Sequence, residues 1–256
     1  MDHSSEIARL AGRISPGARV TVLTGAGVSA ASGVPTFRGP GGLWRNYAPE
    51  QLATPEAFRR DPQLVWEWYN WRREVVSRCD PNAAHRVLAA WSLRYPGFRL
   101  ITQNVDGLHE RAGTQNVVRF HGSIWEVSCW DRCPSSPGRW RDDTVPFAVM
   151  VPRCPYCGGC LRPGVTWFGE MIDPEVIEAS VSAARSCDVF ITAGTSAVVY
   201  PAAGLVYEAG SSGAFTAEIN PDATSASATV DLVIRSGAEI ALPQVEELLL
   251  RGPASR

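Results

Sequence analysis

The chain has 256 residues, of which 45% are hydrophobic and 20% charged, and its net charge is −2. That composition is typical of a globular protein with one large core, and the near-neutral charge provides no overall field to attract nucleic acid. The first ten residues contain no apolar stretch, and no apolar run approaches the ~20 residues of a membrane span. We therefore expect a cytoplasmic protein that binds neither nucleic acid nor a membrane.

Six short apolar segments, rich in β-branched residues, predict strands, and helix-like segments separate most of them. The predicted strands are residues 18–24, 98–102, 116–120, 187–193, 213–219 and 232–234. The predicted helices are residues 83–94, 174–186, 201–209 and 242–251. Strands that alternate with helices indicate an α/β fold, built on a doubly wound, Rossmann-like parallel sheet.

Two segments interrupt this alternation. Residues 54–77 are helix-like and rich in Trp and Arg, whereas residues 128–160 are polar and rich in Pro and Cys. We predict that both belong to a small lobe inserted into the Rossmann-like lobe of a single catalytic domain, residues 1–256. The predicted large lobe covers approximately residues 1–40, 83–125 and 162–256. The predicted small lobe covers approximately residues 41–82, which are helical, and 126–161, which bind a metal.

Four cysteines form two pairs with close spacing: Cys129 with Cys133, and Cys154 with Cys157. Thiolates in two tight turns can bind one tetrahedral ion, and four filled positions leave none open, so the ion should be structural. Iron–sulfur ligation and unrelated free thiols are the alternatives. Cys160 could replace Cys157, whereas the remaining two cysteines, Cys79 and Cys187, are predicted to be inert buried thiols.

A glycine-rich turn follows the first predicted strand. Gly25, Ala26 and Gly27 could bring backbone N–H groups close to a pyrophosphate, and Ala30 occupies the third fingerprint position. No acidic residue ends a second strand about 20 residues further on, as a dinucleotide-binding dehydrogenase would require. The turn therefore predicts either a nucleotide site or a purely structural turn, and it argues against ordinary hydride transfer.

Polar residues follow the second and third predicted strands. Asn104 and Asp106 could hydrogen-bond a ribose or an amide, although they could also simply cap a turn. His121 ends the third predicted strand, and a neutral imidazole there could act as a general base. The alternative is a buried histidine bonded to a backbone carbonyl.

Tyr69 and Arg72 are three residues apart and would share one face of a helix. A guanidinium together with a phenol suits recognition of a carboxylate. The alternative is that the aromatic residues pack inward while Arg72 points into solvent.

Taken together, these features resemble the sirtuin family. The matching stretches are residues 25–38, 103–106, 121–123, the four paired cysteines, and residues 165–170, 194–196 and 219–220, in family order along nearly the whole chain. The resemblance implies a protein-lysine deacylase that consumes NAD as a co-substrate and carries one structural zinc ion. It further implies that the acyl-lysine oxygen displaces nicotinamide, and that His121 then acts as general base on a ribose hydroxyl.

The resemblance also assigns site residues. Asn104 and Asp106 would join His121 in the catalytic set. The implied cofactor-binding residues are Gly25, Ala26, Gly27, Ser29, Phe37, Arg38, Trp44, Gln103, Asn104, Val105, Asp106, Gly194, Thr195, Ser196, Asn220, Pro221, Asp222 and Ala238. The implied substrate-binding residues are Tyr69, Arg72, Phe168, Gly169 and Glu170, the last three as a strand that pairs with the substrate backbone.

Tyr69 and Arg72 resemble the pair found in the class of bacterial and mitochondrial desuccinylases. They imply a preference for succinyl- or malonyl-lysine over acetyl-lysine, with nicotinamide and O-acyl-ADP-ribose as products. We expect a monomer whose partners are acylated-lysine proteins. The alternatives are a mono-ADP-ribosyltransferase that uses the same NAD site, an NAD sensor without turnover, and an ordinary dehydrogenase.

Overall fold

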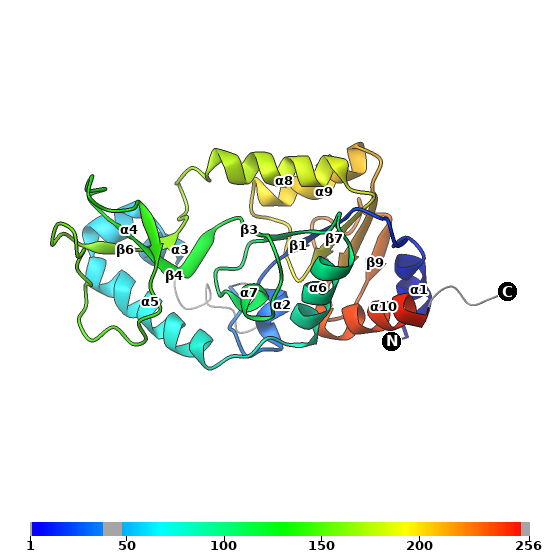
Figure 1. Cartoon of the computed structure of the whole chain (residues 1–256), viewed down its shortest axis with the longest axis horizontal. Helices are drawn as coiled ribbons and strands as arrows, with labels where there is room; N and C mark the ends of the chain where they lie inside the picture. The colour runs from blue at the N-terminus through cyan, green and yellow to red at the C-terminus, as the bar shows by residue number, and fades with distance from the viewer. Residues whose placement is uncertain (1, 38–47, 252–256) are drawn as a thin grey trace.

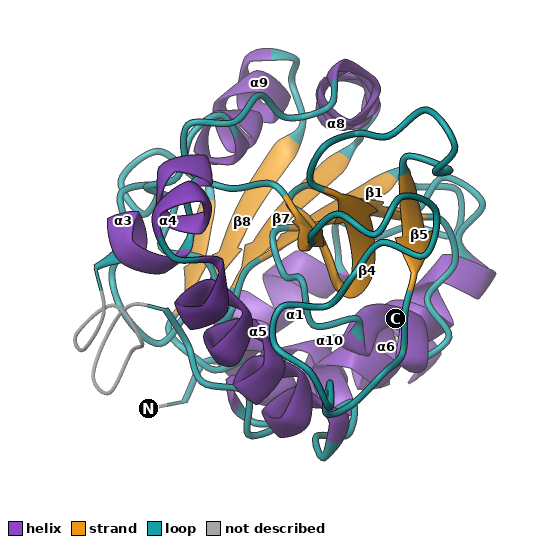
Figure 2. Cartoon of the chain, turned by 90° about the vertical axis from the view of Figure 1, so that its left-hand side faces the viewer, coloured by secondary structure: helices purple, strands orange, loops and turns teal. Residues whose placement is uncertain are grey.

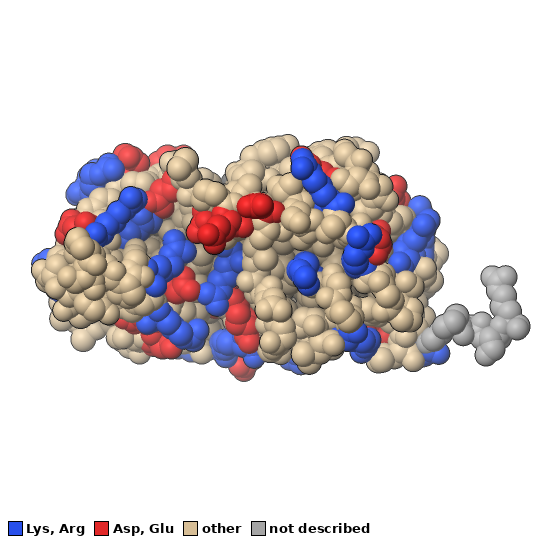
Figure 3. Space-filling model, turned by 45° about the horizontal axis from the view of Figure 1, so that its top comes forward, with Lys and Arg blue, Asp and Glu red and all other residues tan. Residues whose placement is uncertain are grey.

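The computed structural model describes residues 2–37 and 48–251 (Figure 1). The molecule is elongated, with a large parallel sheet towards one end and a smaller group of helices and strands at the other. Within the described part of the chain, no helix combines the length and the apolar character needed to cross a membrane. Arg side chains and carboxylates are interspersed over the face that Figure 3 draws.

The large sheet has six parallel strands in the order β3-β2-β1-β7-β8-β9. The strands are β1 (Val20–Thr24), β2 (Arg99–Thr102), β3 (Val117–Arg119), β7 (Val189–Ala193), β8 (Phe215–Ile219) and β9 (Leu232–Ile234). Every residue of β1 and β7 is buried, which explains why these strands are continuous apolar runs in the sequence. The predicted doubly wound fold is confirmed.

Helices cover both faces of this sheet. Three helices share a core with one face: α1 (Ser4–Ala11), α6 (Ala83–Arg94) and α10 (Ala238–Arg251). On the other face lie α8 (Pro174–Ser186), α9 (Leu205–Ser211) and the 3-10 turn η2 (Ala202–Gly204). Figure 1 shows α8 and α9 together above the sheet, with α6, α10 and α1 below it.

Three helical segments differ from the sequence prediction. The helix α1 was not predicted, yet it buries Ile7 and Leu10 in the core. The predicted helix at 201–209 is divided between η2 and α9. The helix α10 begins four residues earlier than predicted and contains Pro243. Because proline lacks the N–H that a helix interior requires, the sequence favoured a start just before that residue.

The smaller group combines three helices with an antiparallel sheet. The helices are α3 (Pro49–Leu52), α4 (Pro55–Arg60) and α5 (Pro62–Ser77), and the strand order is β5 (Arg139–Arg141), β4 (Gly122–Cys129), β6 (Leu161–Val165). The predicted helical stretch 54–77 breaks at Asp61, whose carboxylate caps α5 by accepting from Leu64 N–H at 2.9 Å. In Figure 2, α5 lies in front of the parallel sheet.

Strand β4 runs across position 125, where the predicted large lobe ends, and it pairs with β6 on the far side of the inserted segment. The exact lobe boundaries therefore stay a prediction. Strand β4 nevertheless has a clear consequence for the site, because it connects the end of the parallel sheet directly to the paired cysteines.

Candidate functional site

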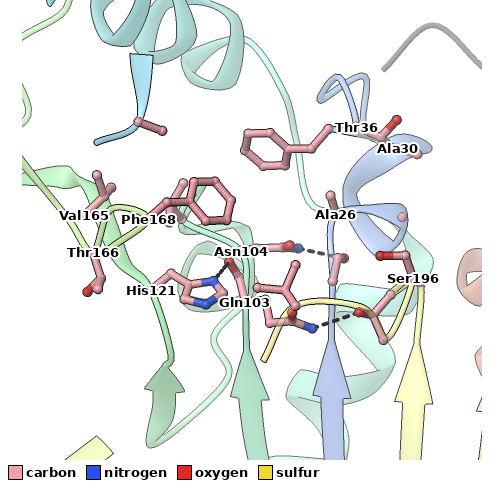
Figure 4. Close-up of a pocket in the computed structure, with 18 of the residues that line it drawn as sticks. Ala26, Ala30, Thr36, Gln103, Asn104, His121, Val165, Thr166, Phe168 and Ser196 are labelled. Carbon is pink, nitrogen blue, oxygen red and sulfur yellow. Dashed lines mark hydrogen bonds between the residues drawn. The ribbon is translucent and has the colours of Figure 1, made fainter. Parts of the chain in front are cut away.

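The carboxyl ends of β1, β2, β7 and β8 open into a cavity of about 980 Å³. The strand order reverses at β1, which lies between β2 and β7, and ligands of doubly wound folds bind at such a switch point. The loops that follow these strands line the cavity with residues 25–27, 103–105, 194–196 and 220–224. Figure 4 shows several of these side chains above the strand ends.

Close packing explains the glycines of the first loop. A Cβ on Gly25 would lie 2.7 Å from the Cβ of Thr195, and one on Gly27 would lie 2.8 Å from the Cα of Gly194. The Gly27 N–H also donates to the Gly194 carbonyl oxygen at 2.8 Å. The glycines thus bring two cavity loops together, and the short helix α2 (Gly27–Ala30) begins at the cavity wall. The two alternatives for this turn, a structural role and a nucleotide site, are therefore compatible.

Polar side chains fix the loops to one another. Gln103 Nε2 donates to Thr195 Oγ1 at 2.9 Å, and Asn104 Nδ2 donates to the Gly25 carbonyl oxygen at 3.0 Å (Figure 4). Asn220 Nδ2 donates to the Thr195 carbonyl oxygen at 2.9 Å. Four neighbouring loops therefore form one preorganised wall.

His121 lies between β3 and β4 and lines the cavity. Its Nδ1 is 3.2 Å from the Gln103 carbonyl oxygen (Figure 4). Because a carbonyl can only accept, Nδ1 carries the proton and Nε2 keeps its lone pair. Burial lowers the pKa of His121, and the bond to Gln103 opposes this effect. The ring is therefore neutral near pH 7. The bond to a backbone carbonyl, which the sequence offered as an alternative to a general base, leaves Nε2 unprotonated and is compatible with that role.

Ser29 and Asp106 are buried just beneath the cavity. Ser29 Oγ donates to Asp106 Oδ2 at 2.8 Å, and Leu108 N–H donates to Asp106 Oδ1 at 2.9 Å. Burial raises the pKa of Asp106, while these two bonds oppose the rise. Neither Ser29 nor Asp106 is among the described residues that line the cavity, so their direct contacts with a cofactor stay predictions.

Two further histidines lie next to this pair, and no sequence pattern indicates a function for them. His85 Nε2 is 3.4 Å from Ser29 Oγ, and His109 Nε2 is 3.0 Å from Thr24 Oγ1. Their ring centroids are 4.7 Å apart. Burial lowers the pKa of each histidine to about 3, so both are neutral at physiological pH.

Tyr69 and Arg72 project from α5 into the other end of the cavity. Arg72 is only 5% exposed, and its guanidinium carbon lies 4.5 Å from the ring centroid of Phe37 and 5.0 Å from that of Trp68. The alternative in which Arg72 points into solvent is therefore wrong. Tyr69 Oη accepts from Trp167 Nε1 at 2.9 Å, and burial raises the pKa of the phenol to about 12.

The segment predicted to be a substrate-pairing strand is a turn in this structure. Strand β6 ends at Val165, and Gly169 adopts a left-handed φ of 83°. The Glu170 carboxylate accepts from Trp167 N–H at 2.8 Å and forms an ion pair with Arg162 at 2.5 Å. These bonds close the chain on itself, which explains the difference. Phe168, Gly169 and Glu170 still line the cavity.

Most of the other predicted site residues also lie at the cavity. The described lining includes Gly25, Ala26, Gly27, Phe37, Gln103, Asn104, Val105, Gly194, Thr195, Ser196, Asn220, Pro221, Asp222 and Ala238. Arg38 and Trp44, also predicted to bind the cofactor, lie outside the described residues.

The four paired cysteines converge at the far end of the small sheet. The sulfur atoms of Cys129, Cys133, Cys154 and Cys157 all lie within 4.8 Å of one another. The Sγ atoms of Cys129 and Cys157 are 3.6 Å apart, and those of Cys133 and Cys154 are 3.8 Å apart. A tetrahedral zinc ion with bonds of about 2.3 Å requires sulfur separations of about 3.8 Å. The cluster therefore fits one zinc ion, held by four thiolates with no open position.

Cys160, which the sequence left as an alternative ligand, is not a member of this cluster. Cys79 and Cys187 are buried, as predicted, and desolvation raises the pKa of both thiols.

The fold and the site define a dinucleotide-binding α/β protein with a four-cysteine metal centre. A sequence profile described as the Sir2 family matches residues 25–201. A protein of Aquifex aeolicus (strain VF5), named NAD-dependent protein deacylase, is 46% identical over 230 residues, which cover 90% of this chain and 95% of that protein. One of the same name from Mycolicibacterium paratuberculosis is 45% identical over 237 residues, or 92% of this chain and 98% of that protein.

Solved structures agree with these relatives. A Sir2 homolog in complex with NAD superimposes with a TM-score of 0.84 at 44% identity, covering 94% of this chain and 93% of that one. A complex described as Sir2, p53 peptide and NAD+ has a TM-score of 0.81 at 26% identity, covering 96% of this chain and 98% of that one. The chain belongs to the Sir2 family.

Proposed function

We propose that this Sir2-family enzyme, an NAD-dependent protein deacylase, prefers lysine side chains that carry acidic acyl groups such as succinyl and malonyl. The family and its named relatives support the deacylase activity itself. The acyl preference is the finer step. It depends on one observation, the buried guanidinium of Arg72.

Within the described chain Arg72 forms no hydrogen bond and no ion pair, and its guanidinium faces the rings of Phe37 and Trp68. Tyr69 and Asp106 act on its charge without bonding to it. Burial lowers the pKa of Arg72, but an arginine remains charged at physiological pH. A buried cation without a directly bonded carboxylate is costly, so a carboxylate that reaches it from the cavity recovers part of that cost. A charge-assisted, bidentate contact contributes about 1.5–3 kcal/mol, which corresponds to about ten- to a hundredfold in selectivity.

The remaining side chains support the chemistry of NAD cleavage. NAD supplies an electrophilic ribose carbon, from which nicotinamide departs as the acyl oxygen of the substrate attacks. Asn104 and Asp106 would orient the ribose and the nicotinamide amide. Nε2 of His121 would take the proton of a ribose hydroxyl, whose oxygen then attacks the acyl carbon. One water molecule would complete the step, in which the lysine amine leaves and the acyl group stays on ADP-ribose. The four thiolates would hold one zinc ion, which fastens the small sheet and takes no part in the reaction.

The test compares succinyl-, malonyl- and acetyl-lysine peptides of one sequence, incubated with NAD and analysed by mass spectrometry. Arg72→Met should remove the preference for acidic acyl groups and leave deacetylation near the parent level. Arg78→Met is the matched control, because that side chain is 80% exposed at the end of the same helix. Retained succinyl selectivity in Arg72→Met would refute the acyl assignment.

The mono-ADP-ribosyltransferase alternative is decided in the same assay. A deacylase releases nicotinamide only when an acylated peptide is present. Release with an unacylated protein, together with a mass increase of that protein by ADP-ribose, would favour the transferase.

A further inference from the structure

We propose that Trp125 is a positioning residue, which holds the loop that carries Asp106 in its working geometry. The indole Nε1–H of Trp125 donates to the backbone carbonyl oxygen of Asp106 at 2.6 Å. Trp125 is not among the described residues that line the cavity. We therefore place its effect at Asp106, and the inference rests on the proposed role of that carboxylate.

Strand β4 forms hydrogen bonds with two successive residues of the loop that follows β2, Val105 and Asp106. One residue before the indole contact, Ile124 N–H donates to the Val105 carbonyl oxygen at 2.9 Å. Buried backbone carbonyls require such partners, so β4 fixes the course of the loop. The chain then changes direction at Gly107, which has a left-handed φ of 78°. A Cβ on this residue would lie only 2.9 Å from Trp125 Cδ1. The glycine thus provides both the turn and the space for the indole.

The indole of Trp125 also contacts a buried arginine, Arg73. Arg73 is 1% exposed, and its guanidinium carbon lies 5.7 Å from the ring centroid of Trp125. Arg73 Nε donates to the Ile124 carbonyl oxygen at 2.6 Å, and Nη1 lies 3.2 Å from Asp142 Oδ1. Asp142 N–H in turn donates to the Trp125 carbonyl oxygen at 3.0 Å. The ring therefore has a fixed place between α5, the inserted segment and the loop.

These contacts determine where the Asp106 carboxylate points. Its two oxygens accept from Leu108 N–H and from the Ser29 hydroxyl, and both bonds require a fixed backbone at Asp106. Without the indole N–H, the carbonyl of Asp106 would lose its partner, and the peptide could rotate. We therefore expect the step that needs Asp106, the departure of nicotinamide, to slow down.

The first experiment measures nicotinamide release in a single turnover with the best acyl-lysine peptide. Trp125→Phe keeps an aromatic ring against Gly107 but removes the N–H, and the rate should fall about fivefold, as expected for one lost hydrogen bond. Trp71→Phe is the matched control, since Trp71 is 41% exposed on α5, and its rate should equal that of the parent. Zinc content and Tm are measured for both variants. A parent-like rate for Trp125→Phe would overturn the inference.

A double-mutant cycle separates this inference from the proposed role of Asp106. If Asp106→Ala does not slow nicotinamide release, the role of Asp106 is refuted. If Asp106→Ala slows release, Trp125→Phe should add nothing further in that background. An equal fivefold effect in both backgrounds would mean that Trp125 acts elsewhere and would overturn the inference alone. Asp106→Asn serves if the alanine variant does not fold.

A second readout does not depend on turnover. The indole N–H resonance that disappears in Trp125→Phe should shift when NAD is added, whereas the Trp71 resonance should not. An unchanged Trp125 resonance at saturating NAD would also contradict the inference.

Discussion

The guanidinium of Arg72 rests on the ring of Phe37, with 4.5 Å between the guanidinium carbon and the ring centroid. Arg72 belongs to the predicted acyl-binding pair, whereas Phe37 belongs to the predicted cofactor-binding set. Both side chains line the same cavity. The two binding functions therefore meet at one cation–π contact.

Removal of this contact should weaken acyl selectivity. A cation–π pair of this kind contributes about 0.5–2 kcal/mol. We expect Phe37→Leu to lower the ratio of kcat/KM for succinyl-lysine over acetyl-lysine about threefold, because Arg72 loses one of the two rings that hold it. Steady-state kinetics with both peptides measures the ratio. An unchanged ratio would mean that Trp68 alone positions the guanidinium.

The pH dependence of activity should reflect a neutral His121. Burial lowers the pKa of this side chain, so the base form persists to lower pH than that of an exposed histidine. We predict that kcat/KM rises with pH, with a midpoint below about 6.5, the unperturbed value, and then reaches a plateau. His121→Ala should remove most of the activity together with this rising limb. A midpoint well above 6.5 would contradict the assignment.

Stability should fall in mild acid because of His85 and His109. Each has a folded-state pKa of about 3, below the unperturbed value, so the unfolded chain binds more protons between these limits. Their neutral forms stabilise the fold fully above pH 6.5, and this stability is lost as the pH falls. At pH 5.5 each should cost about 1.4 kcal/mol. Urea unfolding of the parent and of His85→Gln at pH 7.5 and 5.5 measures the loss, which should be smaller in the variant.

Removal of the metal should unfold the small sheet. The four thiolates connect the end of β4 to the segment that precedes β6, and without an ion they would repel one another when ionised. A strong chelator should release one zinc ion per chain and lower Tm, with loss of activity in parallel. Cys129→Ser should behave like the chelated parent, whereas Cys160→Ser should keep its zinc. Full activity in a zinc-free sample would contradict this expectation.

The chain contains 24 arginines and no lysine. Reactive acyl donors therefore have no Nε-amine to modify. We predict that incubation with succinyl-CoA, followed by hydroxylamine to remove thioesters from cysteine, leaves at most one acyl group, at the N-terminal amine, and does not change the activity. Intact-mass spectrometry gives the count. Arg78→Lys, an exposed substitution, should restore one further site, and several acyl groups on the parent chain would contradict the prediction.

The sequence predicted the parallel sheet well because its central strands are buried on both faces. An apolar run such as 187–193 is recognisable as a buried strand without tertiary information. The turn residues that follow such strands place the polar loops at one edge of the sheet. The same logic predicted Gln103, Asn104 and His121 at the cavity. The small sheet was not predicted, because β4 and β6 pair across the inserted segment and neither has a clean apolar alternation.

Other features depend on contacts that no local pattern encodes. Ser29 stays a predicted cofactor-binding residue, and the bond from its hydroxyl to Asp106 joins residues 77 positions apart. His85 contacts Ser29 only because α6 packs behind the glycine loop. Trp125 is an ordinary strand aromatic in the sequence, and its bond to Asp106 joins residues 19 positions apart. Burial and partners of this kind become visible only in three dimensions.

In the proposed function, one cavity joins NAD cleavage to an acidic acyl chain held by Arg72. The most direct test is a competition in one tube, with equal amounts of succinyl- and acetyl-lysine peptides of the same sequence and an excess of NAD. We predict that the succinyl peptide is consumed about ten to a hundred times faster, with one nicotinamide released per acyl group removed. Equal rates for the two peptides would refute the acyl preference, and deacylation without NAD consumption would refute the proposed reaction.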